Sequence, residues 1–150
     1  MKKLISILVV CLIVFSSLSV FAAAESIIIN GQEAVIPSDM GSIKEMDDRT
    51  FVPVRFVMEN LGCNVEYLEE DRTAVISSIA CTYIIQEGNN TLFVLPDQYT
   101  ETQNIVMDTA AFIDEAESRM YVPIRFLAEA IGYDVGWNEE TQTVTLDIKK

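Results

Sequence analysis

Neighbouring carboxylates are the residues of this sequence with the clearest capacity for chemistry. Glu69 is followed by Glu70, and Glu139 by Glu140, so that two pairs lie 70 positions apart. A glycoside hydrolase uses two carboxyl groups across a cleft, in environments that push their pKa values apart. Adjacent residues in a turn share one solvated environment. The pairs therefore predict a solvated acidic edge, and an exported hydrolase with a carboxylate site is only a weak alternative.

Carboxylates also gather in two short segments that could bind a hard cation. Ca²⁺ prefers oxygen ligands, which Asp and Glu side chains supply. The candidate ligands are Glu45, Asp47, Asp48, Asp114, Glu115 and Glu117. Neither segment has the ligand spacing and fixed glycine of an EF-hand loop. A calcium-dependent adhesion or folding domain is therefore an alternative function, and solvated acidic turns are the preferred interpretation.

The sequence contains no histidine. Biological copper oxidation centres rely on imidazole ligands, and a nucleophilic cysteine needs a histidine base. The 6 glycines form no run that could cradle a phosphate. We therefore expect a protein that is not an enzyme and carries no cofactor.

The first residues have the pattern of a secretory signal peptide. Lys2 and Lys3 precede an apolar run from Leu4 to Phe21, and Ala22-Ala23-Ala24 forms a small-residue cleavage site. We expect residues 1–24 to be removed, with no membrane insertion after cleavage. An uncleaved membrane anchor is the alternative. The protein is expected to be secreted, in association with the cell surface or cell wall.

The remaining part, residues 25–150, has the length of a single domain and is strongly acidic. It keeps 8 basic and all 23 acidic residues, a net charge of −15. Such a charge repels nucleic acid, anionic lipid and anionic wall polymers. A protein component of the cell surface or wall is the expected partner, and no nucleic acid is expected. Solubility of an exported protein is the alternative explanation of the charge.

Two cysteines remain in this part of the chain, Cys63 and Cys81. Export would permit a disulfide between them. The residue 70 positions after Cys63 is Tyr133, however, so a repeated fold does not require the bridge. Both interpretations stay open: a disulfide, or two small buried hydrophobic side chains.

An internal repeat indicates the elements that position these residues. Residues 49–56, RTFVPVRF, match residues 119–126, RMYVPIRF, and the similarity continues without a gap to Ile76 and Leu146. The two copies span approximately residues 35–76 and 105–146. Self-similarity at a fixed period predicts a repeated structural unit, here with two-fold character.

Each copy predicts one short helix. Pro53 and Pro123 suit the first helical position, where no amide proton is needed, and apolar residues follow at helical spacing. Gly62 and Gly132 suit a left-handed C-terminal stop. Each helix has about two and a half turns, which is too short to be stable alone. Both helices must therefore pack against a sheet.

Strand patterns fill most of the remaining chain. They occupy residues 26–30, 33–36, 63–67, 73–76, 81–86, 91–95, 105–107, 133–137 and 143–146, and residues 39–47 and 108–117 are interpreted as strand ends with turns. The predicted fold class is α+β, a mostly antiparallel sheet curled around two short helices with an internal two-fold repeat. Tyr67 and Trp137 occupy equivalent positions and are expected to face the core.

Arg55 and Arg125 place a positive charge in the first turn of each helix, which costs about 0.3–1 kcal/mol if the charge is exposed and unpaired. A carboxylate should offset that cost. The candidate partners are Glu59 and Glu129, four residues on, and Glu45 and Glu115 from the preceding turns. The hypothesis is that both arginines are structural clamps, and that replacing either by alanine costs about 2–4 kcal/mol if the pair is buried.

The repeated motif resembles the N-terminal stalk domain of copper amine oxidases, a module found widely in exported bacterial proteins. The residues that carry the resemblance and are expected to be structural are Pro53, Arg55, Glu59, Gly62, Tyr67, Pro123, Arg125, Glu129, Gly132 and Trp137. The resemblance covers nearly all of residues 25–150. It implies an antiparallel sheet curled around helices, with no catalytic group of its own.

The sequence also departs from that family's pattern. The expected Asn-Gly turn is present at Asn30-Gly31 but has no mate near residues 95–97, and Tyr67 stands where the more typical residue is tryptophan. The self-made quinone of an amine oxidase needs a tyrosine that follows asparagine, and no such pair occurs. We therefore expect an exported, non-catalytic, stalk-like module that binds or spaces cell-surface components and has no amine oxidase activity.

Overall fold

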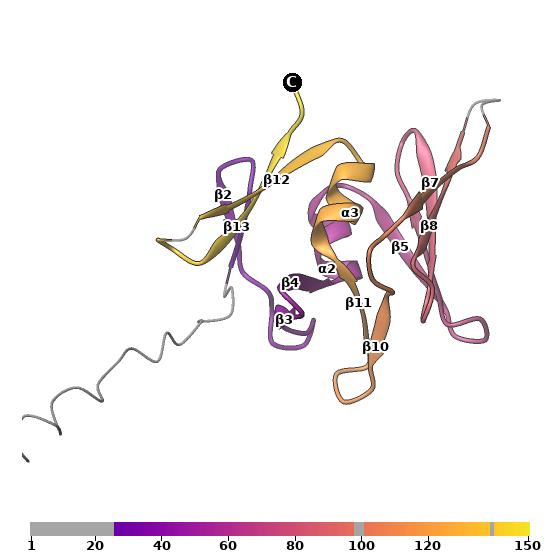
Figure 1. Ribbon diagram of the computed structural model, residues 1–150, viewed down its shortest axis with the longest axis horizontal. Helices are drawn as coiled ribbons and strands as arrows, with labels where there is room; N and C mark the ends of the chain where they lie inside the picture. Colours follow the sequence, from indigo (N-terminus) through magenta and orange to yellow (C-terminus); the bar gives the residue numbers. More distant parts are fainter. Residues whose placement is uncertain (1–25, 98–100, 139) are drawn as a thin grey trace, which may run out of the picture.

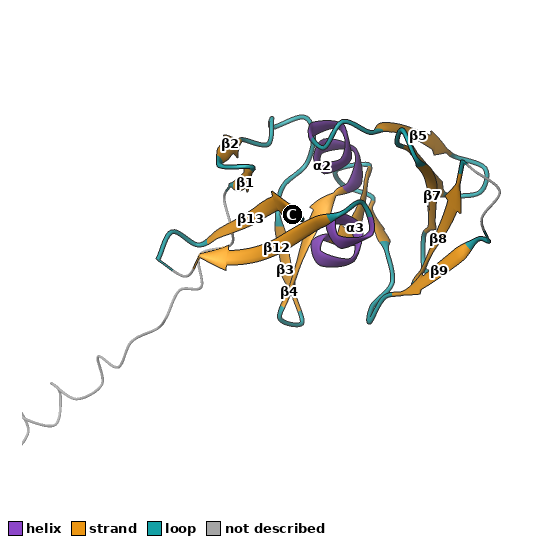
Figure 2. Cartoon of the chain, turned by 90° about the horizontal axis from the view of Figure 1, so that it is seen from above, coloured by secondary structure: helices purple, strands orange, loops and turns teal. Residues whose placement is uncertain are grey.

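The computed structural model describes residues 26–97, 101–138 and 140–150. Within these residues, thirteen strands form three sheets around two short helices. Figures 1 and 2 show the helices side by side, with one sheet on either side of the pair. The expected signal peptide lies outside the described residues, as does Glu139. In the part of the chain that is described, no helix has the length and apolar character to cross a bilayer.

Sheet B lies at the centre of the fold and leads directly into both helices. It contains β10 (Phe112–Asp114), β11 (Arg119–Pro123), β4 (Arg49–Pro53) and β3 (Lys44–Met46), in that order, with antiparallel neighbours. Across its middle, Val52 of β4 lies opposite Val122 of β11. Since β4 continues into α2 (Val54–Asn60) and β11 into α3 (Ile124–Ala130), this pairing brings the two helices together.

The helices begin and end at the residues that the sequence suggests. Pro53 and Pro123 are the N-cap residues, with φ of −63° and −62°, one position before the predicted first turn. Gly62 and Gly132 follow the helices with φ of +80° and +90°, a conformation that glycine adopts without steric cost. Each helix has 7 residues, which leaves its stability dependent on tertiary packing.

The two outer sheets enclose the helices. Sheet C contains β5 (Asn64–Leu68), β6 (Thr73–Ser77), β7 (Cys81–Gln86), β8 (Thr91–Pro96) and β9 (Gln103–Val106), in chain order and antiparallel. Sheet A has the order β12 (Tyr133–Asn138), β13 (Thr143–Ile148), β1 (Ile27–Ile29), β2 (Gln32–Ala34). Strand β1 runs parallel to β13, whereas the other neighbours are antiparallel.

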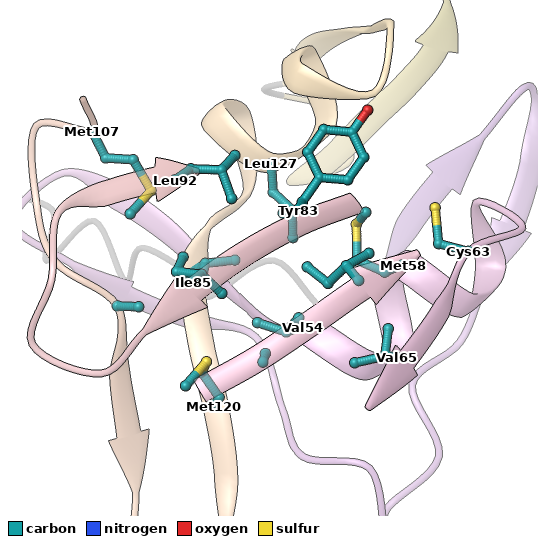
Figure 3. Close-up of a cluster of buried hydrophobic side chains, with 14 of the residues drawn as sticks. Val54, Met58, Cys63, Val65, Tyr83, Ile85, Leu92, Met107, Met120 and Leu127 are labelled. Carbon is teal, nitrogen blue, oxygen red and sulfur yellow. The ribbon is translucent and has the colours of Figure 1, made fainter. Parts of the chain in front are cut away.

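Both helices contribute to two hydrophobic clusters. Met58 of α2 and Leu127 of α3 pack against sheet C, where Figure 3 shows them near Tyr83. Val57 and Ala128, from the other sides of the same helices, pack in the second cluster with the residues of sheet A. A helix with apolar residues on two faces is stable only between two layers. This explains why each short helix is enclosed from both sides.

The structure confirms a mostly antiparallel fold with two short helices, and α+β describes it. The core position predicted for Trp137 is wrong, because this side chain is 44% exposed. Trp137 lies on β12, an edge strand of sheet A. Its mate Tyr67 is half-buried and packs against the first cluster. The two-fold repeat remains a prediction.

Candidate functional site

Two open cavities flank the helices, and we call them groove 1 and groove 2. Groove 1 has a volume of about 620 Å³ and contains Arg55 and Tyr67. Groove 2 has a volume of about 900 Å³ and contains Arg125 and Trp137. These two pairs of residues are mates in the 70-residue register of the sequence. The structure therefore places equivalent residues in two separate grooves.

One side of each groove is formed by a hairpin from the other half of the sequence. Glu115 and Arg119, from the β10–β11 hairpin, line groove 1 beside the start of α2. Glu45 and Arg49, from the β3–β4 hairpin, line groove 2 beside the start of α3. The central pairing of β4 with β11 produces this exchange, because it sets each hairpin against the opposite helix.

All five arginines of the sequence line the two grooves. Groove 1 contains three of them, Arg55, Arg72 and Arg119, with two carboxylates, which gives a formal charge of +1. Groove 2 contains two arginines and four carboxylates, a formal charge of −2. In a chain of net charge −13, the lining of groove 1 is thus rich in arginine, although Arg55 and Arg72 are also paired with Glu59 and Glu87, which are not lining residues.

The structural clamp hypothesised for Arg55 stays a prediction, but its ion pair with the candidate partner Glu59 is exposed and not buried. Its side chain is 45% exposed, and its Nη1 donates to the Val65 carbonyl oxygen (3.0 Å) and more weakly to Glu59 Oε1 (3.4 Å). The neighbouring Val54 and Phe56 face the core, so that Arg55 projects outward from the same turn. The carbonyl bond satisfies a backbone acceptor on β5, which is an edge strand of sheet C.

For Arg125, the structure does not show the carboxylate partners that the sequence suggests. Arg125 is exposed, and it has no hydrogen bond or ion pair with any residue that the structure describes, Glu129 included. The proposed partners from the turns are used elsewhere. Glu45 accepts from Thr50 Oγ1 (2.7 Å), and Glu115 accepts from Arg72 Nη2 (2.5 Å).

Arg72 is the most strongly paired cation of groove 1. Its Nε and Nη2 donate to Glu87, the latter at 2.9 Å, and Nη2 also reaches Glu115 on the β10–β11 turn. The hydrogen bonds from Arg72 lower the pKa of the Glu87 carboxyl, and the same bonds raise the pKa of Arg72. The Glu115 side chain is 75% exposed, so this second ion pair is a surface contact.

Arg119 has a buried donor that lacks a partner. Its Nη1 and Nη2 donate to the carbonyl oxygens of Ser118 (2.9 Å) and Asp39 (2.6 Å), but its Nε is buried without an acceptor among the described residues. The mate of this residue, Arg49, donates from Nε to Asp108 Oδ2 at 2.8 Å. In the 70-residue register, the position that matches Asp108 is Ser38. Groove 1 therefore lacks a carboxylate that groove 2 has.

The calcium candidates of the second segment are already paired with protein cations and donors. Lys44 Nζ lies 2.8 Å from Asp114 Oδ2 and 3.0 Å from Glu117 Oε1. A hydrogen bond from Lys44 lowers the pKa of Asp114, and hydrogen bonds from Tyr121 and then Lys44 lower the pKa of Glu117. No cluster of three metal-ligating side chains occurs in the described ranges.

The calcium candidates of the first segment have a structural role. Asp47 and Asp48 form the two-residue turn between β3 and β4, with φ of +50° and +58°, which small polar residues tolerate better than most. Arg49 Nη1 donates to the Asp47 carbonyl oxygen at 2.6 Å. The geometry thus supports turn formation at these positions and gives no support to a calcium cage.

The other sequence candidates also show no catalytic geometry. Glu69 and Glu70 are both exposed in the β5–β6 turn, and Glu140 is exposed. The thiols of Cys63 and Cys81 are free in the structure, so the possible disulfide is not formed. Cys63 belongs to the cluster against sheet C, and burial raises its thiol pKa. It behaves as a small hydrophobic residue.

Three groove residues, Arg49, Arg72 and Arg119, were missed as site candidates by sequence reasoning. The signal was partly present, since Arg49 and Arg119 are identical mates at the start of the repeated motif. Arg72 had no such signal, because the residue that matches it is Gln142. Only the folded chain shows that these arginines gather around two grooves.

Together, the enclosed helices and the two grooves define a small α+β module. The chain matches the family model of the copper amine oxidase N-terminal domain over residues 28–146, and it belongs to this family. No curated protein and no solved structure gives a significant match. The family name mentions copper, but the sequence offers no imidazole, so its residues do not fit a copper oxidation centre.

Proposed function

We propose that this protein is an exported, non-catalytic, stalk-like module that binds or spaces components of the cell surface or cell wall and has no amine oxidase activity. Its family supplies the first support, because that domain is the N-terminal part of amine oxidases and not their catalytic part. The observation that carries the binding role is the gathering of three of the five arginines around groove 1. Arginines that only kept the protein soluble would be spread over the surface.

The proposal includes a two-fold repeat as the basis of the scaffold. Its support is the strand register, in which the mates Val52 and Val122 lie directly opposite each other. On one side of them Tyr121 lies opposite Pro53, and on the other side Pro123 lies opposite Phe51. Because Tyr121 matches Phe51 and Pro123 matches Pro53, the second pair is the first with each residue replaced by its mate. Such an arrangement gives two related grooves that have diverged in charge.

Export and the nature of the partner rest on the sequence. The basic start, apolar run and triple alanine of residues 1–24 support secretion. The charge of −15 expected after cleavage disfavours nucleic acid and anionic wall polymers as partners. We therefore propose a protein partner at the cell surface.

Affinity capture tests the proposal. The protein, purified from an exporting bacterial host, is immobilised and exposed to a native cell-surface extract, and bound proteins are identified by mass spectrometry. The expected result is a protein partner that is retained by the folded protein and lost after thermal unfolding. Peroxide release from amine substrates, or stoichiometric copper that survives dialysis against a weak chelator, would overturn the proposal.

A further inference from the structure

We propose that groove 1 binds a carboxylate presented by a partner protein, in a short acidic segment whose neighbouring side chains are apolar. This inference rests on the proposed function, because it names the ligand class of the proposed binding module. Four features of the groove carry it: its charge, a displaceable carboxylate, a buried donor without an acceptor, and an apolar lining.

The charge of groove 1 is opposite to that of the chain. Its three arginines outnumber its two glutamates, whereas the whole sequence has 23 acidic and 10 basic residues. Arg55 is 45% exposed, and its Nε and Nη2 make no hydrogen bond with a described residue. Guanidinium groups bind carboxylates through parallel N–H donors. Arg55 therefore offers free donors inside a cavity that is lined by three arginines.

A protein carboxylate already occupies part of the groove. Glu115 Oε1 lies 2.5 Å from Arg72 Nη2, although the Glu115 side chain is 75% exposed. Exposed ion pairs are weak because water competes for both partners. The Arg72–Glu87 pair would remain if Glu115 moved, since both Nε and Nη2 donate to Glu87. Glu115 thus stands in for a ligand carboxylate and can be displaced by it.

The buried Nε of Arg119 points to the same ligand class. In the other half of the sequence, the equivalent Nε of Arg49 is satisfied by Asp108. No described residue takes that place in groove 1, and a buried donor without an acceptor is costly. A carboxylate that enters between Arg55 and Arg119, with a small adjustment of the Arg119 side chain, would supply the missing acceptor.

The lining of groove 1 determines what surrounds the carboxylate. The half-buried Tyr67 and Ile113 contribute apolar surface beside the arginines, and the buried residues Val54, Val65, Ala74 and Met120 lie beneath them. A ligand that fills the groove must therefore carry apolar groups next to its charge. A long polyanion would extend beyond the groove onto an acidic surface and be repelled. A short peptide segment with one acidic residue between apolar ones satisfies both conditions.

The test measures fluorescence anisotropy of dye-labelled, capped pentapeptides, with leucine on both sides of a central glutamate, glutamine or phosphoserine. The protein is the form purified from an exporting host. Arg55→Gln removes an exposed donor of groove 1, and Glu115→Gln removes the carboxylate that competes with the ligand for Arg72. Arg125→Gln is the matched control in groove 2. Thermal melting verifies that each variant is folded.

The glutamate peptide should bind, and the glutamine peptide should bind at least about tenfold more weakly. Arg55→Gln should weaken binding of the glutamate peptide about tenfold, as expected for a charged hydrogen bond. Glu115→Gln should strengthen binding about threefold, because the internal competitor is lost. Arg125→Gln should leave the affinity within about twofold of the wild type.

The inference is overturned by equal binding of the glutamine peptide, by tighter binding of the phosphoserine peptide, or by equal losses in Arg55→Gln and Arg125→Gln. Failure of the inference is distinguishable from failure of the proposed function. If a captured surface protein binds Arg55→Gln as tightly as wild type, the binding module stands and groove 1 is not its site. If the glutamate peptide binds as expected but no surface partner is captured, the proposed function fails.

Discussion

Replacing Tyr121 by phenylalanine should lower the free energy of unfolding by about 2–3 kcal/mol. Tyr121 is fully buried, its hydroxyl donates to Glu117, and the same oxygen accepts the Ser42 amide at 3.0 Å. The substitution removes a hydrogen bond to a charged group, worth about 1.5–3 kcal/mol, and deprives a partly buried amide of its acceptor. Glu117 keeps Lys44 as a partner, which holds the loss near the lower part of the combined range.

The ring itself should be tolerated in this variant. Phe51 occupies the matching position of the sequence, and the stacking of Tyr121 on Phe112, with centroids 5.3 Å apart, does not involve the hydroxyl. Urea denaturation followed by far-UV circular dichroism measures the loss. A double-mutant cycle with Glu117→Gln should give a coupling energy of about 1 kcal/mol or more. A decrease in the free energy of unfolding of less than about 0.5 kcal/mol, which is the usual error of additivity, would refute this prediction. Additive effects of Tyr121→Phe and Glu117→Gln would refute it as well.

Three further predictions concern other parts of the fold. Arg55→Ala and Arg125→Ala should each cost less than about 1 kcal/mol in urea denaturation, because both side chains are exposed, and a loss above about 2 kcal/mol would restore the buried clamp. Hydrogen bonds hold the folded-state pKa of Asp114 and Glu117 below the ordinary values. The stabilisation that these two carboxylates contribute is therefore complete above about pH 5 and is lost as the pH falls through their folded-state pKa values. Asp114→Asn should flatten the decrease of the melting temperature at acid pH. An unchanged pH dependence in this variant would contradict the prediction. The melting temperature should be the same with and without a thiol reductant, because Cys63 is a free thiol; a drop on reduction would indicate a disulfide.

The local elements of this fold could be predicted because their signals are local. Pro53 and Gly62 bracket α2, and Asn30-Gly31 forms the turn between β1 and β2 with φ of +49° and +79°. The segments 39–47 and 108–117 contain the short strands β3 and β10 with their turns, as interpreted. Such elements depend on turn chemistry and hydrophobic period, which one sequence contains.

The contacts between distant segments could not be predicted. The parallel pairing of β1 with β13 joins residues more than a hundred positions apart, and no local pattern encodes it. Trp137 shares the alternation of its strand, yet its side chain is 44% exposed and lines groove 2, which only the tertiary structure shows. The helix period places Arg55 opposite the core positions, where it pairs with Glu59 four residues on. Whether Glu115 also reaches Arg55 depends on tertiary structure, and this carboxylate is instead paired with Arg72.

The most direct test of the central claim is a binding isotherm of the labelled, exported protein on washed surfaces of the cells that produce it, measured in the presence of a metal chelator. We expect saturable binding of the protein to the cell surface, which persists in the chelator and is lost when the protein is unfolded by heat. Binding that does not saturate, or that disappears when the chelator removes metal ions, would contradict a metal-independent binding module at the cell surface.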